Sequence, residues 1–392
     1  MKISNEKIKQ WEKLLRQIPV SVNNFYGDPL IQWQDTVKKL DDLHNTKHEG
    51  PVGIITKGII TENHAKKLSE FIAKGLNIIV LVSISELPQF EKIGTDHRYE
   101  NIKLLNKHAI PNIAYIRPLI PPYNTSEKII KRMFKKLNEA GSRVVVVSGF
   151  RGDEGIIKDM NPDEKVKFVL RVKVMTKDVY SFVKESASKY NMHLFTRTAC
   201  AISYLVGEKY PYNPYYYSPN LVNCNELKCL LRKTCKPTTQ PKSGSMEFIK
   251  FLGYKAELVG GNCNARCQVK PDNRLKCPSC CTTCFFVEGP RISVKGKIRL
   301  GDITFIRFIT GMLAMQPGRR DDESRDVAKV SLPKFPEIKD IECLNSWWPY
   351  AHIGDKCFGC NYCIEKYYGT SRRNFGFPPA QLIKKIFKNY EA

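Results

Sequence analysis

Cysteine is absent from the first 199 residues of this 392-residue chain, although 14 cysteines lie between Cys200 and Cys363. This absence excludes a thiolate metal centre built by the amino-terminal half alone. Closely spaced cysteines in a chain without a secretion signal favour metal or iron–sulfur ligation over disulfides. The chain therefore divides into a cysteine-free half and a cysteine-rich half.

Long apolar runs and a signal peptide are also lacking. No run of about 18 apolar residues could cross a bilayer, and the opening residues MKISNEKIKQWEKLLRQI form an amphipathic helical pattern. We therefore expect a cytoplasmic protein with no membrane partner.

Acidic residues are few relative to basic ones. The chain has 39 Asp and Glu residues and 63 Lys and Arg residues, which gives a formal charge of +24. Such a charge attracts phosphate-rich partners, nucleic acids included. The lysines are scattered through helical patterns as on solvated faces, and no nucleic-acid motif accompanies them. A basic, zinc-containing nucleic-acid-binding protein is thus an alternative that is not favoured.

Apolar, β-branched runs alternate with amphipathic helical patterns in the first half. Near-continuous hydrophobicity is typical of parallel strands that are buried on both faces. One predicted helix begins at Ser126 and ends at Gly141. Serine is a common N-cap residue, and glycine is common where a helix ends. The pattern predicts an α/β array, with strands in residues 18–26, 51–58, 76–85, 110–119, 142–150 and 192–198.

Polar residues and glycines gather where five of these strands end. Ligands of parallel α/β folds bind at the carboxyl ends of the strands, so we expect a ligand-binding face there. The residues concerned are Gly27, Asp28, Thr56, Lys57, Gly58, Ser83, Ser85, Arg117, Pro118, Ser148 and Gly149.

The stretches FYGDPLIQWQDTVKKL, GPVGIITKGIIT, VLVSIS, IRPLIPPYN and VVVSGFRG, within residues 1–155, resemble the radical S-adenosylmethionine (SAM) superfamily, nearest to its spore-photoproduct-lyase-like members. The resemblance implies a partial (β/α)6 TIM-like barrel that binds SAM at its strand ends. By the same resemblance, the cofactor-binding positions are Gly27, Asp28, Pro29, Ser83, Ser85, Arg117, Asn124, Ser148 and Gly149.

The chain departs from that superfamily at its beginning. It has neither the Cys-x3-Cys-x2-Cys loop nor the strand before it, and it begins in what would be the first helix. An incomplete sheet has an open edge, which proteins usually cover. We expect the amino-terminal helix, the carboxyl-terminal segment or a second subunit to lie against that edge.

Three groups of cysteines follow in the second half. The run Cys357, Cys360 and Cys363 favours an iron–sulfur cluster over zinc, because its spacing presents successive thiolates from one loop. Tyr367 stands where a ferredoxin run has its fourth cysteine, and Cys343 is the nearest replacement. The other two groups, which could hold zinc or an iron–sulfur cluster, are Cys224, Cys229 and Cys235, and Cys263, Cys267, Cys277, Cys280, Cys281 and Cys284.

We expect a partial barrel over residues 1–199, an irregular cysteine-rich metal-binding domain over 200–370 and an amphipathic helix over 371–392. The favoured function is a non-standard radical SAM-type protein with one or two iron–sulfur clusters of the four-iron four-sulfur kind, acting in SAM-dependent radical chemistry or electron transfer. The main alternative is a degenerate binding or scaffold subunit whose metals are structural.

Overall fold

A computed structural model describes residues 4–22, 27–91, 94–149, 158–161, 174–196, 198–207, 239–259 and 291–295, together with 306, 308–312, 314–315 and 341–343. All structural statements below concern these residues. Most of the predicted cysteine groups lie outside them.

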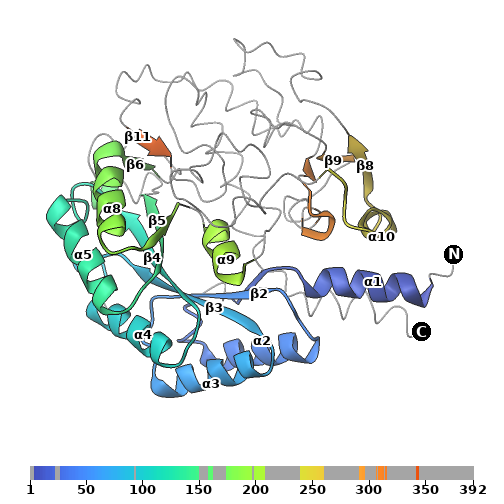
Figure 1. The fold of residues 1–392 in the computed structure, drawn as a ribbon, viewed down its shortest axis with the longest axis horizontal. Coiled ribbons are helices and arrows are strands. Elements are labelled where there is room, and N and C mark those ends of the chain that lie inside the picture. Colours follow the sequence, from blue (N-terminus) through green and yellow to red (C-terminus); the bar gives the residue numbers. More distant parts are fainter. Residues whose placement is uncertain are drawn as a thin grey trace, which may run out of the picture.

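A six-stranded parallel sheet forms the centre of the amino-terminal half (Figure 1). Its strands follow one another in chain order, which is consistent with a partial TIM-like barrel. Each of the six predicted strand regions contains one of them. They are β1 (Val20–Ser21), β2 (Pro51–Thr56), β3 (Asn77–Ile84), β4 (Asn112–Leu119), β5 (Val144–Gly149) and β7 (His193–Phe195).

Helices between these strands cover one face of the sheet (Figure 1). The predicted cap is present, since the Ser126 hydroxyl accepts a hydrogen bond from the Ile129 N–H, and Gly141 has a φ of 79° just after the helix. The helices on this face are α2 (Trp33–Asn45), α3 (Glu62–Ala73), α4 (Asp96–Lys107), α5 (Glu127–Glu139) and α8 (Lys177–Lys189).

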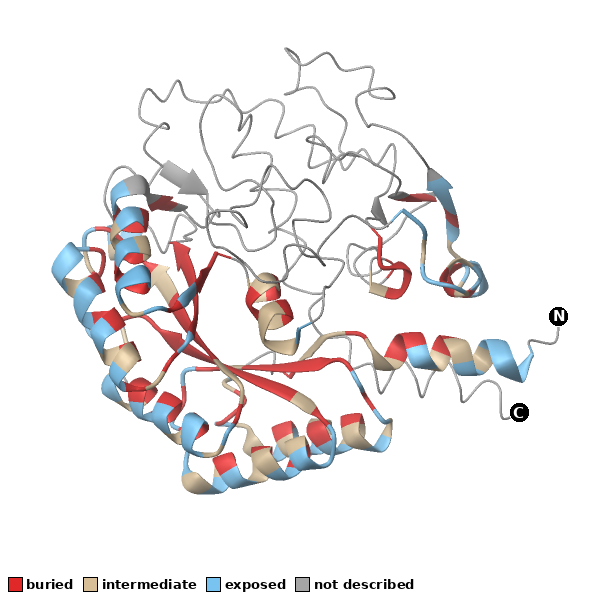
Figure 2. Ribbon diagram, in the orientation of Figure 1, coloured by how far each residue is buried: buried red, intermediate tan, exposed pale blue. Residues whose placement is uncertain are grey.

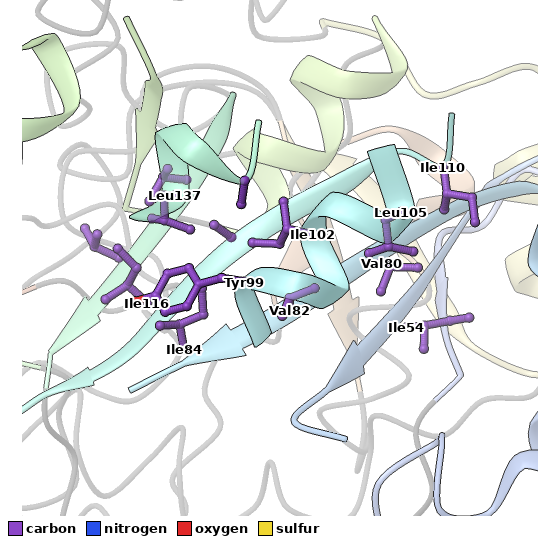
Figure 3. Packing of buried hydrophobic residues seen from close by; sticks show 14 of the residues in the cluster. Ile54, Val80, Val82, Ile84, Tyr99, Ile102, Leu105, Ile110, Ile116 and Leu137 are labelled. Atoms are coloured by element: carbon purple, nitrogen blue, oxygen red, sulfur yellow. The ribbon is translucent and has the colours of Figure 1, made fainter. Parts of the chain in front are cut away.

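The main core lies between this helical layer and the sheet. Alternate strand residues such as Val80, Val82 and Ile116 point into it and meet Ile102 and Leu105 of α4 (Figure 3). Side chains of successive strand residues lie on opposite faces, so the intervening residues point to the other face, which we call the inner face. Figure 2 shows the central strands almost entirely buried, as both faces are covered.

The inner face is covered in part by α9 (Thr198–Val206), which the sequence analysis did not predict. Ala201 of this helix belongs to a buried cluster with Leu81, Ile113 and Val146 of three strands. Figure 1 places α9 on the side of the sheet opposite α3 and α4. Parallel strands with near-continuous hydrophobicity are thereby buried on both faces, as their composition requires.

A second, smaller core lies beyond the sheet. The amino-terminal helix α1 (Asn5–Arg16) packs there against α10 (Ser245–Phe251), and the indole of Trp11 stacks on Phe248 and Phe251 at ring-centroid distances of 5.0 and 5.1 Å. The indole N–H also donates to the Gly244 carbonyl at 3.1 Å. A three-stranded sheet completes the unit, made of β8 (Lys255–Val259), β9 (Arg291–Lys295) and β10 (Ala314–Met315).

The end of α1 is fastened to the loop before β2. The Glu49 and Gly50 N–H groups both donate to the Arg16 carbonyl, at 2.8 and 2.9 Å. A Cβ at position 50 would lie 2.7 Å from the carbonyl oxygens of Gln17 and Ile18, so this close approach requires glycine.

A two-stranded antiparallel sheet joins distant parts of the chain. In it β6 (Val174–Thr176) pairs with β11 (Ile341–Cys343), Cys343 opposite Val174. Because β6 directly precedes α8, which runs back to the start of β7, this pairing lies toward the carboxyl end of the large sheet.

Among the described residues, none of the helices is both long enough and apolar enough to pass through a membrane.

Candidate functional site

Asp28 joins the loop after β1 to the end of β2. One carboxylate oxygen accepts from the Leu30 N–H at 2.9 Å and the Thr56 hydroxyl at 2.6 Å. The other accepts from the N–H groups of Lys57 and Gly58 at 2.6 and 3.2 Å. Four donors thus occupy this carboxylate, which fixes the backbone of both loops.

Glu91 makes the corresponding connection between β2 and β3. Its carboxylate lies 2.5 Å from the Lys57 ammonium and 2.6 Å from the guanidinium of Arg98, which is fully buried. The Ser85 hydroxyl donates to the same carboxylate at 2.6 Å and accepts from Arg98 at 2.9 Å. Burial raises the pKa of Glu91, but the hydrogen bonds from Lys57 and Ser85 outweigh it and hold the pKa below its usual range.

Asn124 continues the series from β3 to β4. Its side-chain amide donates to the carbonyls of Ser85 and Pro118, and its side-chain oxygen accepts from the Ile120 N–H at 2.6 Å. Asp28, Glu91 and Asn124 therefore tie four successive strand ends into one rigid edge.

Two hydroxyls on the inner face of this edge are different. Ser83 of β3 and Ser148 of β5 are buried, and their oxygens have no hydrogen-bond partner in the described part of the chain. A buried hydroxyl without a partner costs about 1–3 kcal/mol. Such groups at the carboxyl ends of parallel strands are therefore suited to a polar ligand.

Arg117 lies between these two serines, on β4. Ser83 is paired with Tyr115 in the sheet, and the Arg117 guanidinium stacks on the Tyr115 ring at 4.2 Å from its centroid. No ion pair joins Arg117 to a carboxylate among the described residues. The inner face here presents a half-buried cation between two buried hydroxyls.

The helix α9 covers the inner face on the amino-terminal side of these polar residues. Its Tyr204 hydroxyl lies 2.6 Å from the His193 ring at the start of β7, so the helix runs from the carboxyl end of the sheet toward its amino end. The cluster around Leu81 and Val146 fills the inner face below the polar residues. A ligand on the inner face would therefore have to bind at the carboxyl end.

The predicted cofactor-binding residues fall into two groups. Asp28, Ser85 and Asn124 are engaged in the hydrogen bonds above, whereas Ser83, Arg117 and Ser148 carry side chains suited to a ligand. The other four predicted residues belong to neither group. The Pro29 carbonyl accepts a hydrogen bond from the Thr36 hydroxyl at 2.7 Å, and the Lys57 ammonium forms an ion pair with Glu91. Gly149 pairs with Leu119 in the sheet, and Gly27 is exposed.

The predicted metal ligands are not described, apart from the backbone of Cys343 in β11. The residues outside the described part are Cys357, Cys360, Cys363, Cys263, Cys267, Cys277, Cys280, Cys281, Cys284, Cys224, Cys229 and Cys235. Within the described ranges, no three His, Cys, Asp or Glu side chains are arranged to hold a metal ion.

The sequence analysis missed Glu91 and Arg98. Neither follows a strand directly, and Arg98 lies in a helix where an arginine normally indicates a solvated face. The sequence does contain one signal for Arg98. This residue is next to Tyr99 on the buried face of α4, and helical periodicity could have predicted that this face is buried.

Comparison with known proteins does not assign this chain to a family. No family model matches the chain, and no curated protein sequence matches it either. Two solved structures of SuiB from Streptococcus suis are similar, one of them bound to S-adenosylmethionine, at 15% and 14% identity and TM-scores of 0.33 and 0.32. The matches cover 54% and 52% of this chain, and the chain spans about half the length of SuiB, 50% and 46%.

Proposed function

We propose that the carboxyl end of the large sheet binds SAM or a related adenosyl compound. The observation that carries this proposal is the set of Ser83, Arg117 and Ser148, in which two buried hydroxyls without partners among the described residues flank a cation on adjacent strands. Such groups suit a ligand that carries both hydroxyls and a carboxylate. The resemblance of the same stretches to radical SAM proteins supports the choice of ligand.

In this proposal Asp28 and Asn124 shape the site rather than contact the ligand. Their hydrogen-bonding atoms are occupied by protein donors and acceptors. Lys57, whose N–H is bound by Asp28, and Gly27, which precedes Asp28 in the chain, form the border of the site on the β1 and β2 side.

The cluster proposal concerns Cys357, Cys360 and Cys363. A four-iron four-sulfur cluster on these thiolates would supply electrons, and with Cys343 as fourth ligand it would have no open iron. The pairing of β11 with β6 supports this arrangement, because it holds the backbone of Cys343 toward the carboxyl end of the large sheet. Zinc at the other cysteine groups remains the alternative.

Calorimetric titration of the metal-loaded protein with SAM tests the adenosyl site. Arg117→Ala should weaken binding about tenfold, because it removes a charge-assisted hydrogen bond. Arg143→Ala is the matched control, since Arg143 lies at the amino end of β5. If wild-type protein shows no heat with SAM, the sheet is a scaffold only.

Iron and sulfide content after anaerobic purification tests the cluster. Cys360→Ser should lower both. Cys343→Ser separates the two ligand sets: loss of one cluster's iron indicates four thiolates, and retained iron with a spectrum sensitive to SAM indicates an open site. A colourless, zinc-only protein would contradict the radical SAM proposal.

A second candidate function is a binding or scaffold subunit without radical chemistry. It is favoured by the side chains of Asp28, Ser85 and Asn124, whose hydrogen bonds are made within the protein. Since the metals of this candidate are structural, it predicts that metal removal destabilises the fold and that the metal-loaded protein does not cleave SAM.

We also propose that another element or a second subunit covers β1, whose far side pairs with no strand in the described residues. Light scattering across a dilution series tests the subunit: a monomer at all concentrations leaves a segment of the same chain as the covering element.

A further inference from the structure

Tyr115 lies at the boundary between the polar residues and the apolar cluster of the inner face. In the sheet it pairs with Ser83 on one side and with Val146 on the other. Its side chain is 3% exposed and belongs to the same buried cluster as Leu81 and Val146. The ring is therefore held in place by residues of both neighbouring strands.

Arg117 follows two residues later on β4, so its side chain leaves the strand on the same face as Tyr115. The guanidinium carbon lies 4.2 Å from the centroid of the Tyr115 ring. Since no carboxylate in the described part of the chain forms an ion pair with Arg117, this ring is the group that orients the cation. A guanidinium stacked on a ring face directs the N–H groups of its edge away from the ring, where they suit a planar carboxylate.

The orientation of Arg117 affects how tightly it can bind a ligand. An arginine side chain has many rotamers, and a ligand that fixes one of them must offset the lost conformational entropy. A ring that already holds the guanidinium reduces this cost before the ligand arrives. The stack on Tyr115 therefore preorganises the cation.

We propose that Tyr115 is a positioning residue of the adenosyl site, whose ring holds the Arg117 guanidinium in the orientation that binds the carboxylate of the ligand. This inference rests on the proposed function, because Arg117 is the group that would contact the ligand. It assigns the role to the ring of Tyr115 rather than to its hydroxyl. It also implies that Tyr115 acts on adenosyl compounds that carry a carboxylate, such as SAM, and not on 5′-methylthioadenosine, which has none.

Calorimetric titration of the full-length, metal-loaded protein with these two compounds tests the inference. Tyr115→Leu should weaken SAM binding about fivefold, the loss expected for one cation–π contact, and should leave 5′-methylthioadenosine binding unchanged. In the Arg117→Ala background the same substitution should cause no further loss, because the two residues act through one contact. Tyr115→Phe keeps the ring and should bind SAM as wild type does.

Phe195→Leu is the matched control. Phe195 is also 3% exposed and belongs to the same cluster as Tyr115, but no cation among the described residues lies over its ring. We expect this variant to lose stability in thermal unfolding while SAM affinity stays at the wild-type value. If Tyr115→Leu does not fold, Tyr115→Met replaces it, since methionine fills irregular space in a core more readily.

Three results would overturn the inference: wild-type SAM affinity in Tyr115→Leu, an equal loss of affinity for both compounds, or a loss in Tyr115→Phe as large as in Tyr115→Leu. Nuclear magnetic resonance of the ligand-free protein supplies a readout without SAM. The ring current of Tyr115 should shift the Arg117 guanidinium protons upfield, and Tyr115→Leu should remove this shift.

The two measurements distinguish this inference from the proposed function. An upfield shift together with no heat from SAM in the wild type means that the proposed function has failed, and the positioning role fails with it. If SAM binds and Arg117→Ala weakens it but the shift is absent, the inference alone is wrong.

Discussion

Asp28 shows how one carboxylate can fix the loops at two neighbouring strand ends, because it accepts four hydrogen bonds from them. Replacing it by Asn would set an amide N–H₂ group against N–H donors that now face an oxygen. We expect Asp28→Asn to destabilise the protein by about 1–3 kcal/mol, because donors at this strand end lose their acceptor, and to speed hydrogen exchange at Lys57 and Gly58. Chemical denaturation and amide exchange measure both effects.

Asp35→Asn is the control for this change, because Asp35 is exposed on α2. Equal stability of the two variants would show that the four hydrogen bonds of Asp28 are dispensable.

His48 gives the protein a pH dependence. The residue is 3% exposed, neither ring nitrogen has a hydrogen-bond partner in the described part of the chain, and burial lowers its pKa to about 4 from 6.5. The unfolded chain therefore binds a proton that the folded chain does not, between pH 6.5 and about 4. Stability should fall across this window as pH decreases, by up to about 3 kcal/mol at ~1.4 kcal/mol per pH unit between the two pKa values.

His48→Leu should remove this part of the pH dependence, and denaturant unfolding at pH 7 and pH 5 measures it. His44→Leu, on the partly exposed part of α2, should retain the wild-type dependence. An unchanged slope in His48→Leu would assign the effect to other groups.

At this scale the sequence located the edge but could not assign its members. Ser83, Ser85 and Ser148 look alike in the sequence, yet Ser85 is bound by Glu91 and Arg98 while the other two have no partner among the described residues. That distinction depends on α4 approaching the end of β3, which no local pattern encodes.

At the scale of the elements, the contact between Gly50 and the segment that joins α1 to β1 can be tested by substitution. Gly50→Ala would place a methyl group 2.7 Å from the carbonyls of Gln17 and Ile18, so the two segments must separate. We expect a loss of about 1–3 kcal/mol in unfolding free energy, as for overpacked cores. Gly94→Ala should be close to neutral, since no atom lies within 4 Å of its added Cβ and Gly94 does not have a positive φ.

A change of less than about 0.5 kcal/mol in Gly50→Ala would mean that the junction can relax, and that α1 is not held rigidly against the sheet.

The six strands of the large sheet were predictable because each is a local apolar run between turn residues. A parallel strand that is buried on both faces must be apolar along most of its length. The helix α9 could not be predicted in this way, because its nine residues TACAISYLV are mostly apolar and show no polar face. A helix that is apolar all round lacks the amphipathic signal on which the prediction of a helix depends.

At the scale of the whole molecule, α1 connects two cores. Its Trp11 face belongs to the smaller core, while its end is hydrogen-bonded to the loop before β2. The predicted boundaries at residues 199 and 370 remain predictions, but the packing of α1 on α10 joins regions that the sequence analysis assigned to different domains.

Trp11→Ala tests this connection. Removing the stacked indole should cost about 3–5 kcal/mol locally, and hydrogen exchange should rise in α1 and α10 while the strands β2 to β5 stay protected. The control is Trp33→Ala on α2, whose indole meets His64 instead and should leave α1 protected. Uniform loss of protection in the large sheet would show that the two cores unfold as one unit.

The contact between Trp11 and Gly244 spans 233 residues of chain, and this has a consequence during synthesis. The strands β1 to β5 find their neighbours as soon as they leave the ribosome, because each pairs with the strand made just before it. The apolar face of α1 is made before these strands but must wait for α10, a delay on the order of 10–50 s at roughly 5–20 residues per second. During that interval the nascent chain carries α1 with its apolar face unpartnered by α10, and this face is a binding surface for a ribosome-associated chaperone.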